Sequence, residues 1–321
     1  MKRVGLFAKI GLLCLIVTGF YQCTNDEELF GGFIIEKDFE NLQEVHDSLV
    51  VYDTVQLVLT DPSVLNTLTA PKGTQFIFPE NSCTLEDGGV PIPPYSFQVV
   101  EVYKRGDMIR HNAQTFTADV PLVSGGFFWI VGKDANGAAI KFTGVSAVLP
   151  YKTDAGGYED STEHFVNTTQ TTPSGNVLSW LLGTSNTDFD PNEGVNGAFT
   201  IDEIKKGWNH VAAPFNLAPS EATQFRVNIQ NFGDLTNAQV FFTLEDFTIV
   251  QALSSVEAGS LKTFAGSVPI NATGKIIAIA LSEGDLLFAS QSIAVTEDAE
   301  YVLEVFPGDL TELNNLLGTF N

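Results

Sequence analysis

Cysteine and histidine are scarce in this sequence of 321 residues, which has 3 Cys and 4 His. Cys14 lies within an N-terminal apolar segment and Cys23 follows that segment directly, so Cys83 is the one cysteine left for the folded part. No internal disulfide is therefore expected there. The histidines show neither the HExxH motif nor the paired spacing of a zinc site; they are His46, His111, His164 and His210.

Positive charge is also scarce, because 16 Lys and Arg stand against 39 Asp and Glu, giving a formal net charge of −23. The first 22 residues contain Lys2, Arg3 and Lys9, so their removal takes away three positive charges and leaves −26. Such a protein repels phosphate backbones and anionic headgroups. We therefore expect no nucleic-acid partner, and we interpret the acidity as an aid to solubility.

Common catalytic motifs are absent from the sequence. It has no GxSxG nucleophile elbow and no phosphate-binding GxxxxGK[ST] loop. Glycosidases need only two facing carboxylates, and 39 acidic residues could include such a pair without marking it. No cofactor is predicted.

The N-terminus has the pattern of an export signal. A basic start, Met1-Lys2-Arg3, is followed by an uncharged, mainly apolar stretch over residues 10–22 and then by Cys23. The stretch is too short for a typical membrane-spanning helix. We predict a lipoprotein signal peptide over residues 1–22, with cleavage without lipid and an uncleaved anchor as the competing interpretations.

The residues after Cys23 include an acidic group, Asp26-Glu27-Glu28. This segment resembles the short acidic tether of surface-exposed lipoproteins from Bacteroidota-type bacteria. The resemblance implies that Cys23 carries the lipid, that Asp26, Glu27 and Glu28 direct export, and that the protein faces the exterior of the outer membrane. A diacyl or triacyl cysteine supplies the two or more chains that stable anchoring requires.

The mature chain reads as mainly β, with two antiparallel β-sandwich (Ig-like) domains and a short C-terminal helix. Strands recur about every ten residues with Gly, Asn and Asp between them. Phe76 and Phe78 should share one face of a strand. Leucines at helical spacing predict a closing helix over residues 309–320, capped by Asp309 or Thr311.

We divide the mature chain into four parts. The predicted borders are an acidic tether and stalk over 23–49, a first sandwich over 50–152, a connector rich in Thr, Asn and Gly over 153–206, and a second sandwich with its closing helix over 207–321.

Several segments are similar to β domains of the same Bacteroidota surface proteins. They are residues 71–82, 101–109 and 124–130, and the Gly207-Trp208 pair that begins the second domain. The resemblance implies β-sandwiches of unassigned activity and brings no catalytic residues with it.

An aromatic sugar-binding platform is one candidate site. Trp208 stands at a strand entry beside Asn209 and His210, and we expect it to be more exposed than Trp129, which lies within a strand. A tryptophan packed at the start of a domain is the competing interpretation.

Alternating oxygens at Asp188, Asp190 and Asn192 resemble a calcium loop. Glu193 and Phe199, however, occupy the sixth and twelfth positions, where such a loop requires Gly and Glu. We interpret these residues as solvated turn acids and predict no metal.

Together these observations favour a non-enzymatic, lipid-anchored cell-surface protein with a binding or structural role. Adhesion, glycan binding and binding of an envelope protein are its possible forms, and a carbohydrate-active hydrolase with an acidic residue pair is the alternative. The membrane link would be the N-terminal lipid, and the sequence specifies no oligomeric state.

Overall fold

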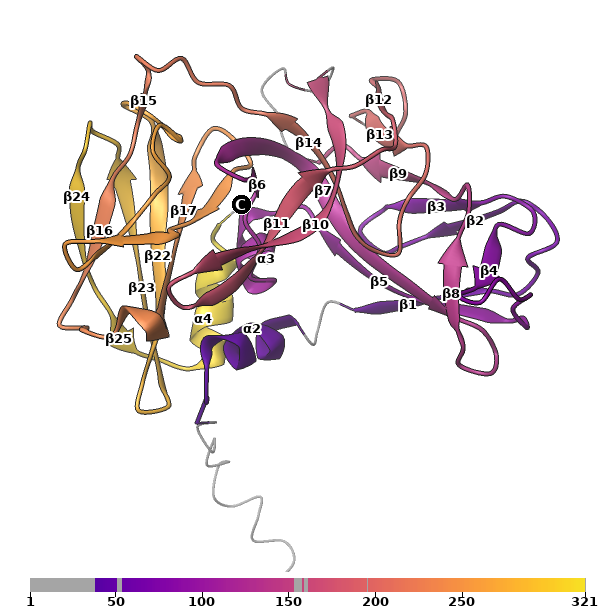
Figure 1. Ribbon diagram of the computed structural model, residues 1–321, viewed down its shortest axis with the longest axis horizontal. Coiled ribbons are helices and arrows are strands. Elements are labelled where there is room, and N and C mark those ends of the chain that lie inside the picture. Colours follow the sequence, from indigo (N-terminus) through magenta and orange to yellow (C-terminus); the bar gives the residue numbers. More distant parts are fainter. Residues whose placement is uncertain (1–37, 51–53, 153–157, 159–160, 195, 321) are drawn as a thin grey trace, which may run out of the picture. The chain divides into compact units, whose positions relative to one another are not determined.

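The computed structural model describes residues 38–50, 54–152, 158, 161–194 and 196–320, and residues 39–321 cluster as one compact unit. Its architecture is mainly β, as predicted, with several antiparallel sheets and three α-helices among the described residues (Figure 1). The helices are α2 (Leu42–Val50), α3 (Arg105–Arg110) and α4 (Leu310–Leu317), and a 3-10 turn, η3, spans Leu235–Asn237.

The first sandwich pairs a nine-stranded sheet with an N-terminal five-stranded sheet. The nine-stranded sheet contains β1 (Val55–Leu59), β4 (Cys83–Leu85), β5 (Tyr95–Val102), β6 (Phe116–Thr117), β7 (Val120–Lys133), β8 (Ala139–Phe142), β10 (Glu163–Thr172), β11 (Gly175–Leu182) and β14 (Gly207–Pro214). The N-terminal five-stranded sheet contains β2 (Asn66–Thr69), β3 (Gln75–Phe78), β9 (Ser146–Pro150), β12 (Thr187–Asp190) and β13 (Ala198–Ile201).

The core of the first sandwich is aromatic. Phe76 and Phe78 lie on the buried face of β3, as the strand period predicts. The Phe76 ring meets Phe128 of β7 at a centroid distance of 5.1 Å, and the Phe78 ring meets Phe97 of β5 at 4.8 Å. These pairs join the two sheets face to face.

The second sandwich pairs a C-terminal five-stranded sheet with a four-stranded sheet, beside a two-stranded ladder. The C-terminal five-stranded sheet contains β17 (Ala238–Leu244), β18 (Val250–Ala252), β22 (Thr273–Ser282), β23 (Asp285–Ala294) and β25 (Phe306–Pro307). The remaining strands are β15 (Ala222–Thr223), β16 (Arg226–Gln230), β19 (Ser255–Glu257), β20 (Ser260–Lys262), β21 (Val268–Pro269) and β24 (Glu300–Glu304). The β16–β24 pair is parallel, which departs from the otherwise antiparallel arrangement.

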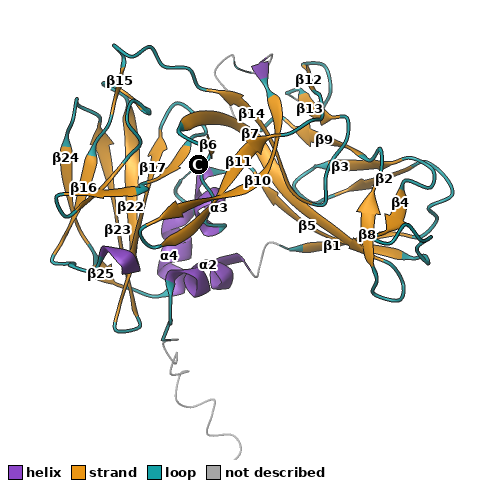
Figure 2. Ribbon diagram, in the orientation of Figure 1, coloured by secondary structure: helices purple, strands orange, loops and turns teal. Residues whose placement is uncertain are grey.

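A central core joins the two sandwiches. Figure 2 shows the three α-helices between the strands of the two halves. Phe127 and Trp180 from the nine-stranded sheet belong to the same buried cluster as Phe241 and Ile277 from the C-terminal five-stranded sheet and Leu313 from α4. Since one cluster of apolar side chains serves both sheets, the sandwiches are packed together and are not joined only by a linker.

Helix α4 confirms the predicted closing helix. The Asp309 carboxylate accepts a hydrogen bond from the Glu312 backbone N–H at 2.8 Å, and the Glu312 carboxylate accepts one from the Asp309 N–H at 3.1 Å. This reciprocal capping box satisfies two backbone donors that the first helical turn leaves open. Leu313 and Leu317 then bury the inner face of the helix.

The predicted connector over 153–206 is wrong, because four strands of this segment belong to the two sheets of the first sandwich. Strands β10 and β11 pair as a hairpin and extend the nine-stranded sheet through β14, while β12 and β13 extend the N-terminal five-stranded sheet. The Thr-rich β10 shows alternating burial along much of its length. Threonine is β-branched and suits a strand with one solvated face, although the composition of the segment resembles that of a loop.

Two further predicted borders are also wrong. Residues 207–214 form β14, which lies between β7 and β10 in the nine-stranded sheet, so they do not begin the second sandwich. The end of the predicted stalk forms α2, which buries Leu42, Val45 and Leu49. Their spacing of three, four and seven residues is that of an amphipathic helix face.

Candidate ligand-binding site

The predicted attachment site lies outside the described residues. This applies to Cys23 and to the acidic tether of Asp26, Glu27 and Glu28. Their roles therefore stay predictions. Within the part of the chain that the structure describes, no helix has both the length and the apolar character needed to cross a membrane.

The expected difference in exposure between Trp208 and Trp129 is absent, and the two candidate residues beside Trp208 are not at the surface. Asn209 and His210 are fully buried. Trp208 is half-buried, like its cross-strand partner Trp129, and its ring packs edge-on against Phe127 at 5.4 Å. The group is therefore part of the β14 packing and does not form an exposed platform.

Asn209 and His210 have identifiable structural partners. The Asn209 side-chain oxygen accepts from the Lys205 backbone N–H at 2.8 Å, and its Nδ2 donates to the Lys205 carbonyl at 2.7 Å. The His210 Nε2 lies 2.8 Å from the Ser124 hydroxyl, and its ring lies 4.3 Å from that of Trp180. Burial lowers the pKa of His210 to about 3, so this imidazole is neutral at pH 7.

Asp188, Asp190 and Asn192 lie on β12 and the turn that follows it. Asp188 and Asp190 are exposed, and Asp190 Oδ1 accepts from the Asn192 backbone N–H at 2.8 Å. This is the local hydrogen bond of a turn acid. In the described ranges, no group of three or more His, Cys, Asp or Glu residues is arranged to hold a metal ion.

Cys83 and His46 are also buried. Burial raises the pKa of the Cys83 thiol to about 11, so the nucleophilic thiolate is disfavoured at neutral pH. His46 Nε2 lies 2.8 Å from the Gln239 side-chain oxygen, and burial lowers the pKa of this histidine. Both side chains contribute to packing between elements that are distant in sequence.

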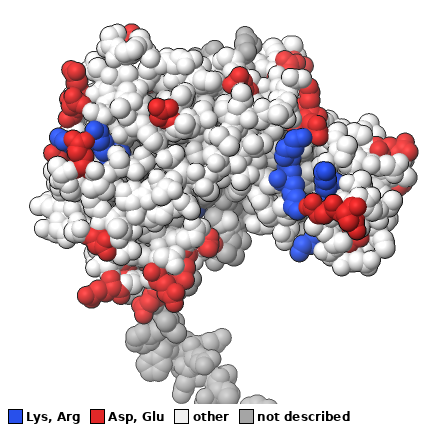
Figure 3. Space-filling view, viewed as in Figure 1, with Lys and Arg blue, Asp and Glu red and all other residues white. Residues whose placement is uncertain are grey.

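Cationic side chains gather around Phe320 near the C-terminus. Four of the 16 Lys and Arg lie outside the described residues, namely Lys2, Arg3, Lys9 and Lys37. Of the remaining twelve, five line two cavities that share Phe320. In contrast, the face in Figure 3 carries scattered acidic side chains, with Lys and Arg lying near Asp and Glu.

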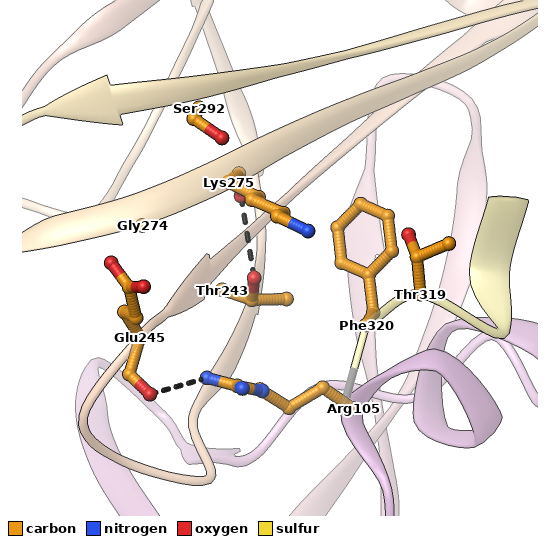
Figure 4. Close-up of a pocket in the computed structure, with 8 residues that line it drawn as sticks. All are labelled: Arg105, Thr243, Glu245, Gly274, Lys275, Ser292, Thr319 and Phe320. Atoms are coloured by element: carbon orange, nitrogen blue, oxygen red, sulfur yellow. Dashed lines mark hydrogen bonds between the residues drawn. The ribbon is translucent and has the colours of Figure 1, made fainter.

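The first cavity has a volume of about 240 Å³ and opens beside the C-terminal five-stranded sheet. Its lining comes from α3, three strands, the loop after β17 and the chain end (Figure 4). The residues are Arg105, Thr243, Glu245, Gly274, Lys275, Ser292, Thr319 and Phe320. We call it the Lys275 cavity.

Two cations define the chemistry of the Lys275 cavity. The Lys275 ammonium lies 5.2 Å from the centroid of the Phe320 ring, and Figure 4 shows it pointing towards that ring. Arg105 Nη1 donates to the carbonyls of Leu244 and Glu245, the second at 3.0 Å. Partial burial lowers the pKa of Arg105, yet an arginine stays charged at neutral pH.

The second cavity, of about 300 Å³, is lined by Lys72, Lys104 and Arg110 among others. Two of these cations have structural partners. Lys72 Nζ lies 3.3 Å from the Asp107 carboxylate, and Arg110 pairs with the same carboxylate. Arg110 Nε also donates to the Asn314 side chain of α4 at 2.7 Å. These cations tie α3 to its surroundings.

A third cavity contains two carboxylates, Glu257 and Asp298, together with Arg226 and Lys262. Lys262 Nζ lies 2.5 Å from Glu257, and this hydrogen bond and charge lower the pKa of the Glu257 carboxyl. A general acid of a glycosidase needs a raised pKa. The arrangement therefore fits an ion-paired surface better than a catalytic pair.

Sequence comparison assigns no relative to this chain: no protein-family model matches it, and no curated protein matches it at a significant level. Sequence reasoning missed the Lys275 cavity because its residues come from positions 105, 243–245, 274–275, 292 and 319–320. No local motif links these segments, and their contact depends on how α3 and α4 pack against the second sandwich.

Proposed function

We propose that this chain is a non-enzymatic, lipid-anchored protein of the outer cell surface, with a binding or structural role. The main support for this proposal is the burial of the histidine and Cys83 side chains, which are common bases and nucleophiles of enzymes. All four histidines and Cys83 are buried. His210, for example, is enclosed by aromatic rings and Cys83 belongs to the core of the first sandwich. The imidazoles and the thiol, which serve many enzymes as bases or nucleophiles, are thus used in packing here.

The sequence of residues 1–28 supports the anchored location. The basic start, apolar stretch, Cys23 and acidic tether together form the pattern of a surface lipoprotein. The net charge of −26 after removal of residues 1–22 disfavours electrostatic adhesion to anionic lipid, so a covalent lipid is the membrane link that we propose.

Metabolic labelling with palmitate in a bacterium that exports lipoproteins tests the anchor. We expect label in the full chain and none in a Cys23→Ala variant, with that variant leaving the membrane fraction. Cys83→Ala is the matched control, because it removes the buried cysteine and should keep the label. Equal membrane retention of the Cys23→Ala variant contradicts the proposal.

Protease treatment of intact cells tests the orientation. We expect the anchored chain to be cleaved without lysis, whereas a periplasmic protein in the same cells stays intact. Protection of the chain until the cells are lysed contradicts exposure at the surface.

A further inference from the structure

Neither cation of the Lys275 cavity forms an ion pair with a described carboxylate, although Glu245 and Asp246 act on Arg105 electrostatically from a longer distance. In the described ranges, no carboxylate lies within 4.0 Å of Lys275 or Arg105, whereas Lys72, Arg226 and Lys262 each form an ion pair. The Lys275 ammonium faces the Phe320 ring, which attracts a cation more weakly than a carboxylate does. An incoming carboxylate would therefore gain a charge-assisted hydrogen bond without displacing an existing ion pair.

Hydroxyl groups surround these cations. Thr243, Ser292 and Thr319 line the cavity from β17, β23 and the segment after α4. The Thr319 hydroxyl already donates to the Leu316 carbonyl at 2.7 Å, and that of Thr243 donates to the Lys275 carbonyl at 3.5 Å. Both oxygens can still accept hydrogen bonds from the hydroxyls of a ligand, and the Ser292 hydroxyl can donate or accept. Glu245 adds a carboxylate at the same cavity, and a carboxylate accepts hydrogen bonds from sugar hydroxyls.

Glu245 also limits the charge of the ligand. A dianionic phosphate would meet this carboxylate as well as the two cations, and like charges repel at close range. A singly charged ligand can place its one carboxylate towards Lys275 and its hydroxyls towards Glu245. The cavity volume of about 240 Å³ lies just below the usual range of about 300–1,000 Å³ for pockets that hold drug-sized molecules, so one sugar ring is a suitable size.

We propose that the Lys275 cavity binds a carboxylate-bearing sugar unit, such as a uronate. Lys275 and Arg105 bind its carboxylate, and Thr243, Ser292 and Glu245 contact its hydroxyls. This inference rests on the proposed binding role and names the ligand class for it. The acidic surroundings repel anions at long range, so the local contacts must supply the affinity.

Ligand-observed NMR titration of the detergent-solubilised full chain with glucuronate tests the proposal. Glucose lacks the carboxylate, acetate lacks the ring, and inorganic phosphate carries more charge, so these three are the comparison ligands. We expect glucuronate to bind with a Kd on the order of 1 mM, as fits a single sugar ring with few contacts. Glucose, acetate and phosphate should each bind at least about tenfold more weakly.

Lys275→Met separates this cavity from general surface charge, because it keeps most of the apolar stem and removes the ammonium. We expect about a tenfold loss of glucuronate affinity. Lys141→Met is the matched control, since Lys141 is an exposed strand lysine on β8 outside the cavity, and it should bind like the original chain. Ser292→Ala should weaken glucuronate by a few-fold and leave acetate unchanged.

Three results overturn the inference: no glucuronate binding up to tens of millimolar, phosphate binding as tightly as glucuronate, or equal binding by the Lys275→Met variant. Urea midpoints of the variants show whether each is folded, so loss of folding is distinguished from loss of the site. If the chain carries palmitate and binds another envelope component but does not bind glucuronate, this inference is wrong and the proposed function stands. Loss of anchoring in the labelling experiment contradicts the proposed function whatever the titration gives.

Discussion

Gly106 lies in a close contact between α3 and α4, and its replacement by alanine tests how the helices pack. A Cβ at this position would lie 1.9 Å from the Leu317 carbonyl oxygen and 2.8 Å from the Leu317 carbonyl carbon. An ordinary C···O contact is about 3.3 Å or longer, so the backbone of α4 would have to retreat by roughly 1.4 Å. The Gly106 N–H, which donates to the Phe320 carbonyl at 2.9 Å, would lose its acceptor as α4 moves.

The magnitude follows from these contacts. Overpacking against backbone costs about 1–3 kcal/mol, and the weakened hydrogen bond adds about 0.5–1.5 kcal/mol. Alanine in a helix regains about 0.5–1 kcal/mol over glycine. We therefore expect Gly106→Ala to lower the free energy of unfolding by about 1–3 kcal/mol.

Urea unfolding followed by tryptophan fluorescence measures this change. Gly233→Ala is the matched control, because a Cβ there meets nothing within 4 Å and its φ lies outside the left-handed region. It should shift the midpoint little in either direction. If both variants unfold at the same urea concentration, the proposed contact between α3 and α4 is refuted.

Two further predictions concern the buried histidines and the last helix. The pKa values of His46, His164 and His210 are lowered mainly by burial, that of His210 to about 3, so below the unfolded value of about 6.5 the unfolded chain binds more protons. The contribution of the histidines to stability should therefore be constant above about pH 7, and stability should fall as pH drops through 6.5, by up to about 1.4 kcal/mol per pH unit for each histidine. Urea midpoints at pH 7.5, 6.0 and 5.0 measure this, and unchanged midpoints contradict the burial of neutral imidazoles. Asp309→Ala should cost about 1 kcal/mol through loss of the capping box, whereas Thr311→Ala should be nearly neutral; thermal unfolding compares them, and equal losses would argue against Asp309 as the cap.

Strand positions with strong local signals were predictable from sequence. Phe76 and Phe78 alternate with less buried residues, and this period identifies a half-buried strand before any tertiary contact is known. Asp309 precedes a helical pattern and has Glu312 three residues later, which is the sequence signature of a capping box. In both cases the information lies within a few consecutive residues.

Features that depend on contacts between residues far apart in the sequence could not be predicted from local patterns. Strand β10 has the composition of a loop, and its place in a sheet is fixed by pairing with β14 and β11. His210 was a candidate binding residue, yet Ser124 and Trp180 enclose it from segments 86 and 30 positions away in the chain. The Lys275 cavity shares this dependence, because none of its lining segments contains a recognisable motif.

Helix α2 has a mechanical consequence for an anchored protein. It packs into the central core that both sandwiches share, and it is the first described helix in the chain. A pulling force applied before residue 39 would therefore reach α2 before any strand of either sandwich. Under load, release of α2 would remove Leu42, Val45 and Leu49 from that shared core and loosen both halves at once. The two sandwiches should accordingly respond to tension from the N-terminal side as one mechanical unit that yields first at α2.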